Sequence, residues 1–204
     1  MDREVVERLI RLSKGLAEML ELTYQSFRKL TEKSIWDVDL ARNEVRKSST
    51  ELTSFLIARS GSSDERSAWT KPFLSMASSF DRMMYNIEGI TNQIRMIIRE
   101  GTPLSDRAVK EINDIFQGAM NLLEKLPDLI LTPDKSLAQH IGEQVRSVMK
   151  IAESYSEQHE ERLIQGICMP KSSPIYLGVI ESLKGVIAHT LEVSGKLVSR
   201  SVSP

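Results

Sequence analysis

The sequence is poor in the residues that mark disulfide-rich or β-sheet proteins. Of its 204 residues only Cys168 is a cysteine, so no internal disulfide can form, which is typical of a reducing compartment. Glycine accounts for 10 residues and aromatic residues for 5%, while Leu, Ile, Met, Glu, Lys, Arg and Ser are abundant. This composition favours helical bundles over β folds, and we predict an all-α protein of the cytoplasm.

The sequence also lacks an excess of charge and a long apolar run. Lys plus Arg is 27 and Asp plus Glu is 28, whereas nucleic-acid binding draws on a basic excess, so no nucleic-acid partner is expected. No apolar run reaches the roughly 18 residues of a membrane span, and the charged start Met1-Asp-Arg-Glu has no signal-peptide core. Association with the inner membrane is expected to be peripheral, through a partner.

Motifs of common enzyme classes are missing as well. The sequence contains no Glu-x-x-His, no Gly-rich phosphate loop, no His-Glu-x-x-His and no Gly-x-Ser-x-Gly. A nucleophilic Cys168 would need a base such as His159 or His189 beside it, and the sequence does not place one there. His159 lies on an apolar stripe and is expected to be a hydrogen-bonded histidine at the end of a bundle. We therefore predict a protein that is not an enzyme.

What the sequence does contain is apolar residues at helical spacing. Steps of three and four residues recur in six stripes, which predict six long helices within residues 5–30, 38–55, 73–97, 112–130, 138–163 and 177–197. Three helices precede Gly101 and three follow it. We predict two tandem three-helix bundle repeats, residues 1–101 and 102–204.

Proline, glycine and small polar residues indicate where these helices begin and end. Thr70 followed by Pro72 predicts the start of the third helix, after a loop over residues 60–67. Gly101 and Gly166 are expected just after helix ends, and Pro127 should bend the fourth helix. Thr132 with Pro133 predicts the start of the fifth helix.

Three helices repeated twice, with a connection before each third helix, resemble the PhoU family of phosphate uptake regulators. The resemblance is closest to the PhoU-like domain attached to sodium/phosphate cotransporters. The family motif Glu-Arg-Ile-Gly-Asp-His on each third helix, which holds metal through two acids on one face, aligns with residues 81–86 and 184–189. Residues 159–170 look like the end of the fifth helix in the cotransporter-type domains. In the two motifs only Asp81 and His189 keep metal-binding residue types, because Tyr85, Lys184 and Ala188 replace the other acids.

The resemblance and the helical spacing together give one set of candidate metal ligands. Asp81 and Glu88 lie two turns apart on one flank of the third helix, where acids of the second helix could face them. The alternative is a row of solvated charges beside a buried stripe. A divalent or iron-type ion would use this set: Asp81, Glu88, Asp37, Asp39 and His189.

A second candidate set concerns protein contacts. Exposed Trp and Arg are frequent interface anchors, which predicts an interaction surface from Trp36, Arg66, Trp69 and Lys71. The resemblance implies a cytoplasmic regulator of phosphate transport that contacts a phosphate transporter component or a sensor kinase, with a homodimer as one form. A metal-binding helical bundle and an accessory module of another ion transporter remain the alternatives.

Overall fold

The computed structural model of the chain describes residues 2–60 and 64–200, and the side chains of all of these except residues 64–68 and 200. All secondary structure within these ranges is helical. The elements are α1 (Arg3–Lys29), α2 (Glu32–Arg59), α3 (Asp64–Glu100), α4 (Asp106–Leu123), α5 (Leu126–Leu131), α6 (Lys135–Ile164) and α7 (Ser173–Arg200). The prediction of an all-α fold with six long helices is confirmed, with α4 and α5 together taking the place of the fourth.

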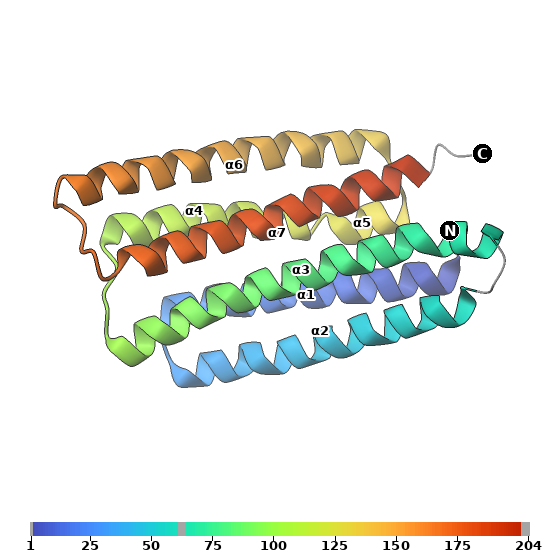
Figure 1. Cartoon of the computed structure of the whole chain (residues 1–204), viewed down its shortest axis with the longest axis horizontal. Helices are drawn as coiled ribbons and strands as arrows, with labels where there is room; N and C mark the ends of the chain where they lie inside the picture. The colour runs from blue at the N-terminus through green and yellow to red at the C-terminus, as the bar shows by residue number, and fades with distance from the viewer. Residues whose placement is uncertain (1, 61–63, 201–204) are drawn as a thin grey trace.

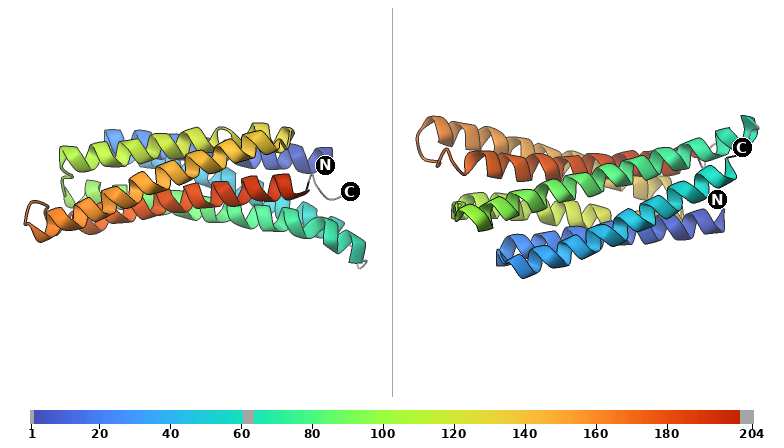
Figure 2. Two further views of the ribbon diagram at one scale, coloured as in Figure 1. Left: turned by 90° about the horizontal axis from the view of Figure 1, so that it is seen from above. Right: turned by 60° about the horizontal axis from the view of Figure 1, so that its bottom comes forward.

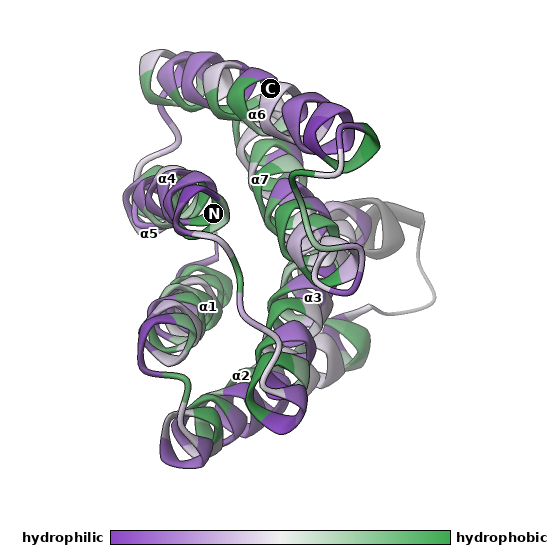
Figure 3. Cartoon of the chain, turned by 90° about the vertical axis from the view of Figure 1, so that its left-hand side faces the viewer, coloured by the Kyte–Doolittle hydropathy of each residue, from purple (hydrophilic) through white to green (hydrophobic). Residues whose placement is uncertain are grey.

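The helices lie roughly along one common direction and form an elongated bundle (Figures 1 and 2). Seen along the helices, α1, α3, α7 and the α4–α5 pair occupy the middle, while α2 and α6 lie at opposite edges (Figure 3). Helix α3 packs most extensively against α7, and α1 packs against both α4 and α5. The two triplets are therefore joined through their first and third helices. None of the helices in the described ranges is both long and apolar enough to cross a membrane.

The ends of the helices follow from residues that satisfy free backbone groups. Thr31, Ser105 and Asp134 each cap a helix start by accepting a hydrogen bond from the amide three residues later. Gly101 and Gly166 follow helix ends with φ of 59° and 71°, as predicted, because glycine adopts the left-handed conformation without steric cost.

Three predicted boundaries were wrong. Helix α3 begins at Asp64, so residues 64–67 are helical and Pro72 lies inside the helix, where packing of Trp69 against Phe73 continues the buried stripe. The fourth helix is interrupted at Glu124 and Lys125 instead of being bent, and Pro127, in the first turn of α5, cannot donate to the carbonyl of Leu123. Asp134, not Thr132, caps α6.

One close glycine contact occurs at the same relative place in both triplets. A Cβ added to Gly15 of α1 would lie 3.2 Å from Val45 of α2, and one added to Gly118 of α4 would lie 2.8 Å from the methyls of Val148 of α6. Both positions of the second pair follow those of the first by the same interval, since 118 minus 15 and 148 minus 45 are both 103. This interval pairs positions of the two predicted repeats.

Candidate functional site

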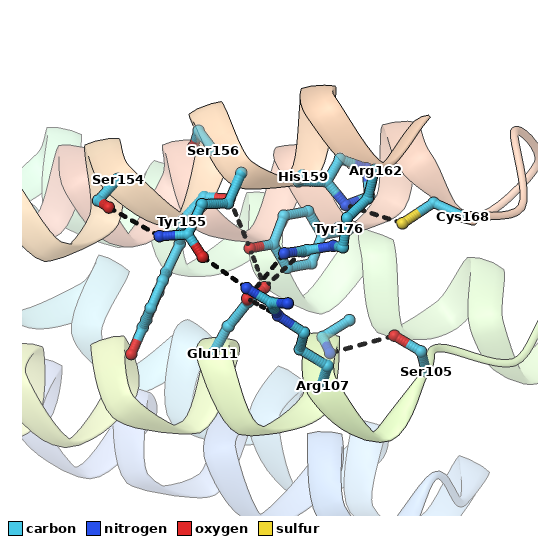
Figure 4. A network of polar contacts seen from close by, with 12 residues as sticks. Ser105, Arg107, Glu111, Ser154, Tyr155, Ser156, His159, Arg162, Cys168 and Tyr176 are labelled. Atoms are coloured by element: carbon cyan, nitrogen blue, oxygen red, sulfur yellow. Dashed lines mark hydrogen bonds and ion pairs between the residues drawn. The ribbon is translucent and has the colours of Figure 1, made fainter. Parts of the chain in front are cut away.

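A buried acidic residue organises one end of the bundle. Glu111 lies on the apolar face of α4, one turn before Ile115, and its side chain is only 5% exposed. A buried carboxylate requires charged or hydrogen-bonding partners. Arg162 of α6 binds it through two hydrogen bonds of 3.1 and 2.9 Å, Arg107 donates to it at 2.9 Å, and the Tyr176 hydroxyl of α7 donates at 2.7 Å (Figure 4).

A histidine and the single cysteine extend this network. The His159 ring stacks on the Tyr176 ring with centroids 4.3 Å apart, and its Nε2 lies 2.7 Å from the Ser173 hydroxyl. Its Nδ1 lies 3.9 Å from the Cys168 sulfur (Figure 4). The prediction that His159 is a hydrogen-bonded histidine at the end of the bundle is confirmed. We call the set Arg107, Glu111, His159, Arg162, Cys168, Ser173 and Tyr176 the Glu111 cluster.

The Glu111 cluster borders a small cavity. Its volume is about 160 Å³, and Cys168, His159 and Tyr176 form part of its wall. The Glu111 carboxylate already accepts hydrogen bonds from three side chains, so it is not free to act as a base. The geometry instead ties α4, α6 and α7 together beside the connection that contains Cys168.

Burial and charge shift the pKa values of this cluster in a consistent direction. Burial by itself raises the pKa of Glu111, but hydrogen bonds from Tyr176, Arg107 and Arg162 outweigh it and leave the pKa lowered. Burial and the neighbouring Arg162 charge lower the pKa of His159. Burial and the hydrogen bond to Glu111 raise the pKa of Tyr176. At neutral pH the cluster therefore holds a charged carboxylate and an uncharged histidine.

We expect acidification to destabilise the fold in two steps. Below the ordinary histidine pKa of 6.5, the unfolded chain takes up a proton that folded His159 resists, so stability falls as pH drops through this window. Below the ordinary Glu pKa of 4.5, Glu111 is protonated in the unfolded chain but stays charged in the folded one. Stability therefore falls further as the pH drops, until the pH is below the pKa of Glu111 in the folded chain.

Urea unfolding between pH 7.5 and 3.5 measures both steps. His159→Gln should remove the first step and keep the second, and the matched change of the exposed His140 to Gln should keep both. An unchanged upper step in His159→Gln would contradict the assignment.

The first triplet has a partly exposed ion-pair cluster at the equivalent place. The interval of 103 residues pairs His159 with Leu56 and Tyr176 with Phe73, and both counterparts are buried apolar residues. Glu111 corresponds to Arg8, Arg107 to Glu4 and Arg162 to Arg59. Arg8 and Arg59 pair with Glu4 at 2.9 and 4.0 Å. The second triplet thus has a buried polar cluster where the first has buried Leu56 and Phe73 beside partly exposed ion pairs.

Comparison with solved structures shows which known fold this helix arrangement resembles. The structure of a PhoU-like protein from Shewanella oneidensis MR-1 superposes with a TM-score of 0.62 at 12% sequence identity, over 96% of this chain and 97% of that one. The chain has a PhoU-like fold. No protein-family model matches the sequence, and no curated protein matches it either. The PhoU-like fold predicted from the sequence is confirmed, and the closer likeness to cotransporter-attached domains stays a prediction.

Within the PhoU-like fold, two of the predicted metal ligands pair with arginines. Asp39 of α2 accepts hydrogen bonds of 2.6 and 2.7 Å from Arg95 of α3. Glu88 of α3 accepts one of 2.8 Å from Arg42 of α2. The charge that faces these acids across the two helices is positive, which satisfies them without a metal ion.

The other three predicted ligands lie apart from this pair of contacts. Asp81 accepts a hydrogen bond from Ser49, Asp37 borders the groove between α1 and α2, and His189 lies 3.2 Å from Glu192 on α7. No three His, Cys, Asp or Glu side chains that could jointly hold a metal ion occur in the described part of the chain. The five candidates do not converge on one point.

The predicted interaction residues are also separated in the PhoU-like fold. Trp36 is 62% exposed near the start of α2, whereas Lys71 is exposed and Trp69 half-buried near the start of α3. Because α2 and α3 run antiparallel, these positions are more than about 30 Å apart along the bundle. Arg66 lies outside the residues whose side chains are described. Trp36 therefore does not share a surface with Trp69 and Lys71.

Sequence reasoning missed Glu111, Arg162 and Tyr176. A signal for Glu111 was available, because an acid lies three residues after Ala108 and four before Ile115 on the apolar face of its helix. The partners come from helices far away in the sequence and carry no comparable signal.

Proposed function

We propose that the protein is a non-enzymatic regulator or accessory protein of phosphate transport that acts by contact with a transporter component or its sensor kinase. The observation that carries this proposal is the match of nearly the whole chain to a PhoU-like protein. The pattern of three helices repeated twice, predicted from the sequence, agrees with it.

A contact surface for such a partner is available where α6 turns into α7. Ile164 is 86% exposed, Ile167 67% and Met169 55%, and all three lie within six residues of each other. Exposed large apolar side chains that are grouped in this way mark interaction sites on soluble proteins. We call Ile164, Ile167 and Met169 the α6–α7 tip, and we propose that it contacts the partner.

Deletion of the gene and co-purification test the function together. Loss of the protein should change phosphate uptake, and a tagged chain should recover a phosphate transporter component or kinase from membranes of the source organism. Unchanged uptake on both low and high phosphate, combined with no such component recovered, would refute the proposal.

The role of the α6–α7 tip is tested by replacing its three apolar side chains. Ile164→Ser, Ile167→Ser and Met169→Ser combined should reduce recovery of the partner at least tenfold, because the contact loses most of its apolar area. Stability should change by less than about 0.5 kcal/mol, since the side chains are exposed. Co-purification and urea unfolding measure the two effects.

The matched control lies at the other end of the bundle. Ile57 is 59% exposed and Leu131 66%, and replacing both with Ser removes exposed apolar area far from the α6–α7 tip. This control should keep full recovery of the partner. Equal loss in both variants would show that the α6–α7 tip has no special role.

A further inference from the structure

A second pocket lies at the same end of the bundle as the α6–α7 tip, on the other side of the α3–α4 connection. Its volume is about 430 Å³, within the range of small-molecule sites. Helices α1, α3 and α4 and the connection at Pro103 and Leu104 surround it. Most of its wall is apolar, and it includes Phe27, Ile97, Leu104 and Val109.

Two polar side chains on this pocket have unused binding capacity. The carbonyl oxygen of the Asn113 side chain is buried and has no hydrogen-bond partner among the described residues. Arg28 is exposed, and in the same part of the chain it has no carboxylate within ion-pair distance. Its guanidinium lies 5.9 Å from the centre of the Tyr24 ring. Arg28 also suits the C-terminal end of α1, but this does not account for Asn113.

Neither polar side chain has a polar counterpart in the other half of the chain. The interval of 103 residues pairs Arg28 with Leu131 and Asn113 with Ile10. Both counterparts are apolar, at the opposite end of the bundle. The polar pair is therefore not a feature that the two halves share.

We propose that this pocket binds an amphipathic carboxylate, with an apolar group inside and its carboxylate on Arg28. Arginine matches a carboxylate through two parallel hydrogen bonds, and the Asn113 amide can turn to pair with a second polar group of the ligand. A single cation beside an apolar wall suits a monoanion better than a phosphate dianion. A free apolar acid and the C-terminal residue of a polypeptide share this chemistry. The inference does not depend on the proposed role in phosphate transport.

Titration of the full chain with small probes tests the site. Octanoate represents a free acid and N-acetyl-leucine a polypeptide C-terminus, while octanamide and N-acetyl-leucinamide are their neutral counterparts. NMR shifts of the methyl groups of Leu30, Ile97, Leu104 and Val109 report binding. For ligands of this size we expect dissociation constants of about 1 mM or lower, with the amides at least tenfold weaker.

The two acids distinguish the source of the ligand. Tighter binding of N-acetyl-leucine would indicate a polypeptide C-terminus, and tighter binding of octanoate a free acid, and either supports the site. Amides that bind as well as the acids, or no shift of these methyl groups up to about 10 mM, would overturn it.

Variants of α1 provide a control for charge alone. Arg28→Gln should weaken both acids at least tenfold without affecting the fold, because the side chain is exposed. Arg3→Gln removes the same charge from the far end of α1, where the side chain is 94% exposed, and should leave binding unchanged. Equal weakening in both variants would mean that only the net charge of the protein matters, and it would contradict the proposal.

Discussion

Glu111→Leu should lower the free energy of unfolding by about 3–5 kcal/mol, the cost of breaking a buried ion pair by removing one partner. The Arg162 side chain is only 11% exposed, and without Glu111 its charge stays buried without a carboxylate. The Tyr176 hydroxyl loses its acceptor at the same time. Urea unfolding followed by circular dichroism measures the change.

The control is an ion pair of the same residue types on the surface. Arg3 and Glu7 are separated by 2.9 Å, with side chains 94% and 58% exposed, so Glu7→Gln should cost less than about 1 kcal/mol. A loss below about 1 kcal/mol in Glu111→Leu would show that the buried cluster is not stabilised through this carboxylate.

The first triplet suggests how the loss can be recovered. Where the second triplet has Tyr176, the first has the buried Phe73, and the fold accommodates it. Replacing a whole buried polar network by apolar residues is often neutral, whereas removing one member is costly. Glu111→Leu combined with Arg162→Met and Tyr176→Phe should therefore be more stable than Glu111→Leu alone.

The helices could be predicted from the sequence because burial repeats along each of them. The stripe that continues through Phe73, Phe80, Ile87 and Ile94 is fully buried in α3, as its spacing requires. The start of α3 was predicted too late because Pro72 is usually a sign of a first turn. Here the packing of Trp69 on Phe73 extends the helix before the proline.

The polar sites were harder to predict because their partners come from other helices. Spacing along α3 placed Asp81 and Glu88 on one flank, but it could not show that Arg42 of α2 faces Glu88. The same holds for Glu111, whose arginine partner on α6 is 51 residues away. Periodicity predicts which face of a helix is buried, and not which charges meet across two helices.

Phe116→Ala tests whether residues 1–101 and 102–204 unfold together. Phe116 of α4 is fully buried, and its ring centroid lies 5.2 Å from that of Tyr24 and 5.8 Å from that of Phe27, both on α1. Truncation of a buried Phe costs about 3–5 kcal/mol. Because the ring packs across the boundary between the two triplets, we expect the loss to destabilise both.

Tryptophan fluorescence separates the two outcomes. Trp36 and Trp69 are the only tryptophans, and both belong to the first triplet, whereas Phe116 belongs to the second. If the triplets unfold as one unit, Phe116→Ala shifts the fluorescence transition by as much as the circular dichroism transition, which reports all helices. If each triplet were a separate folding unit, fluorescence would keep the wild-type midpoint while part of the circular dichroism signal moved. The contacts of α1 with α4 and α5, and of α3 with α7, favour the single transition.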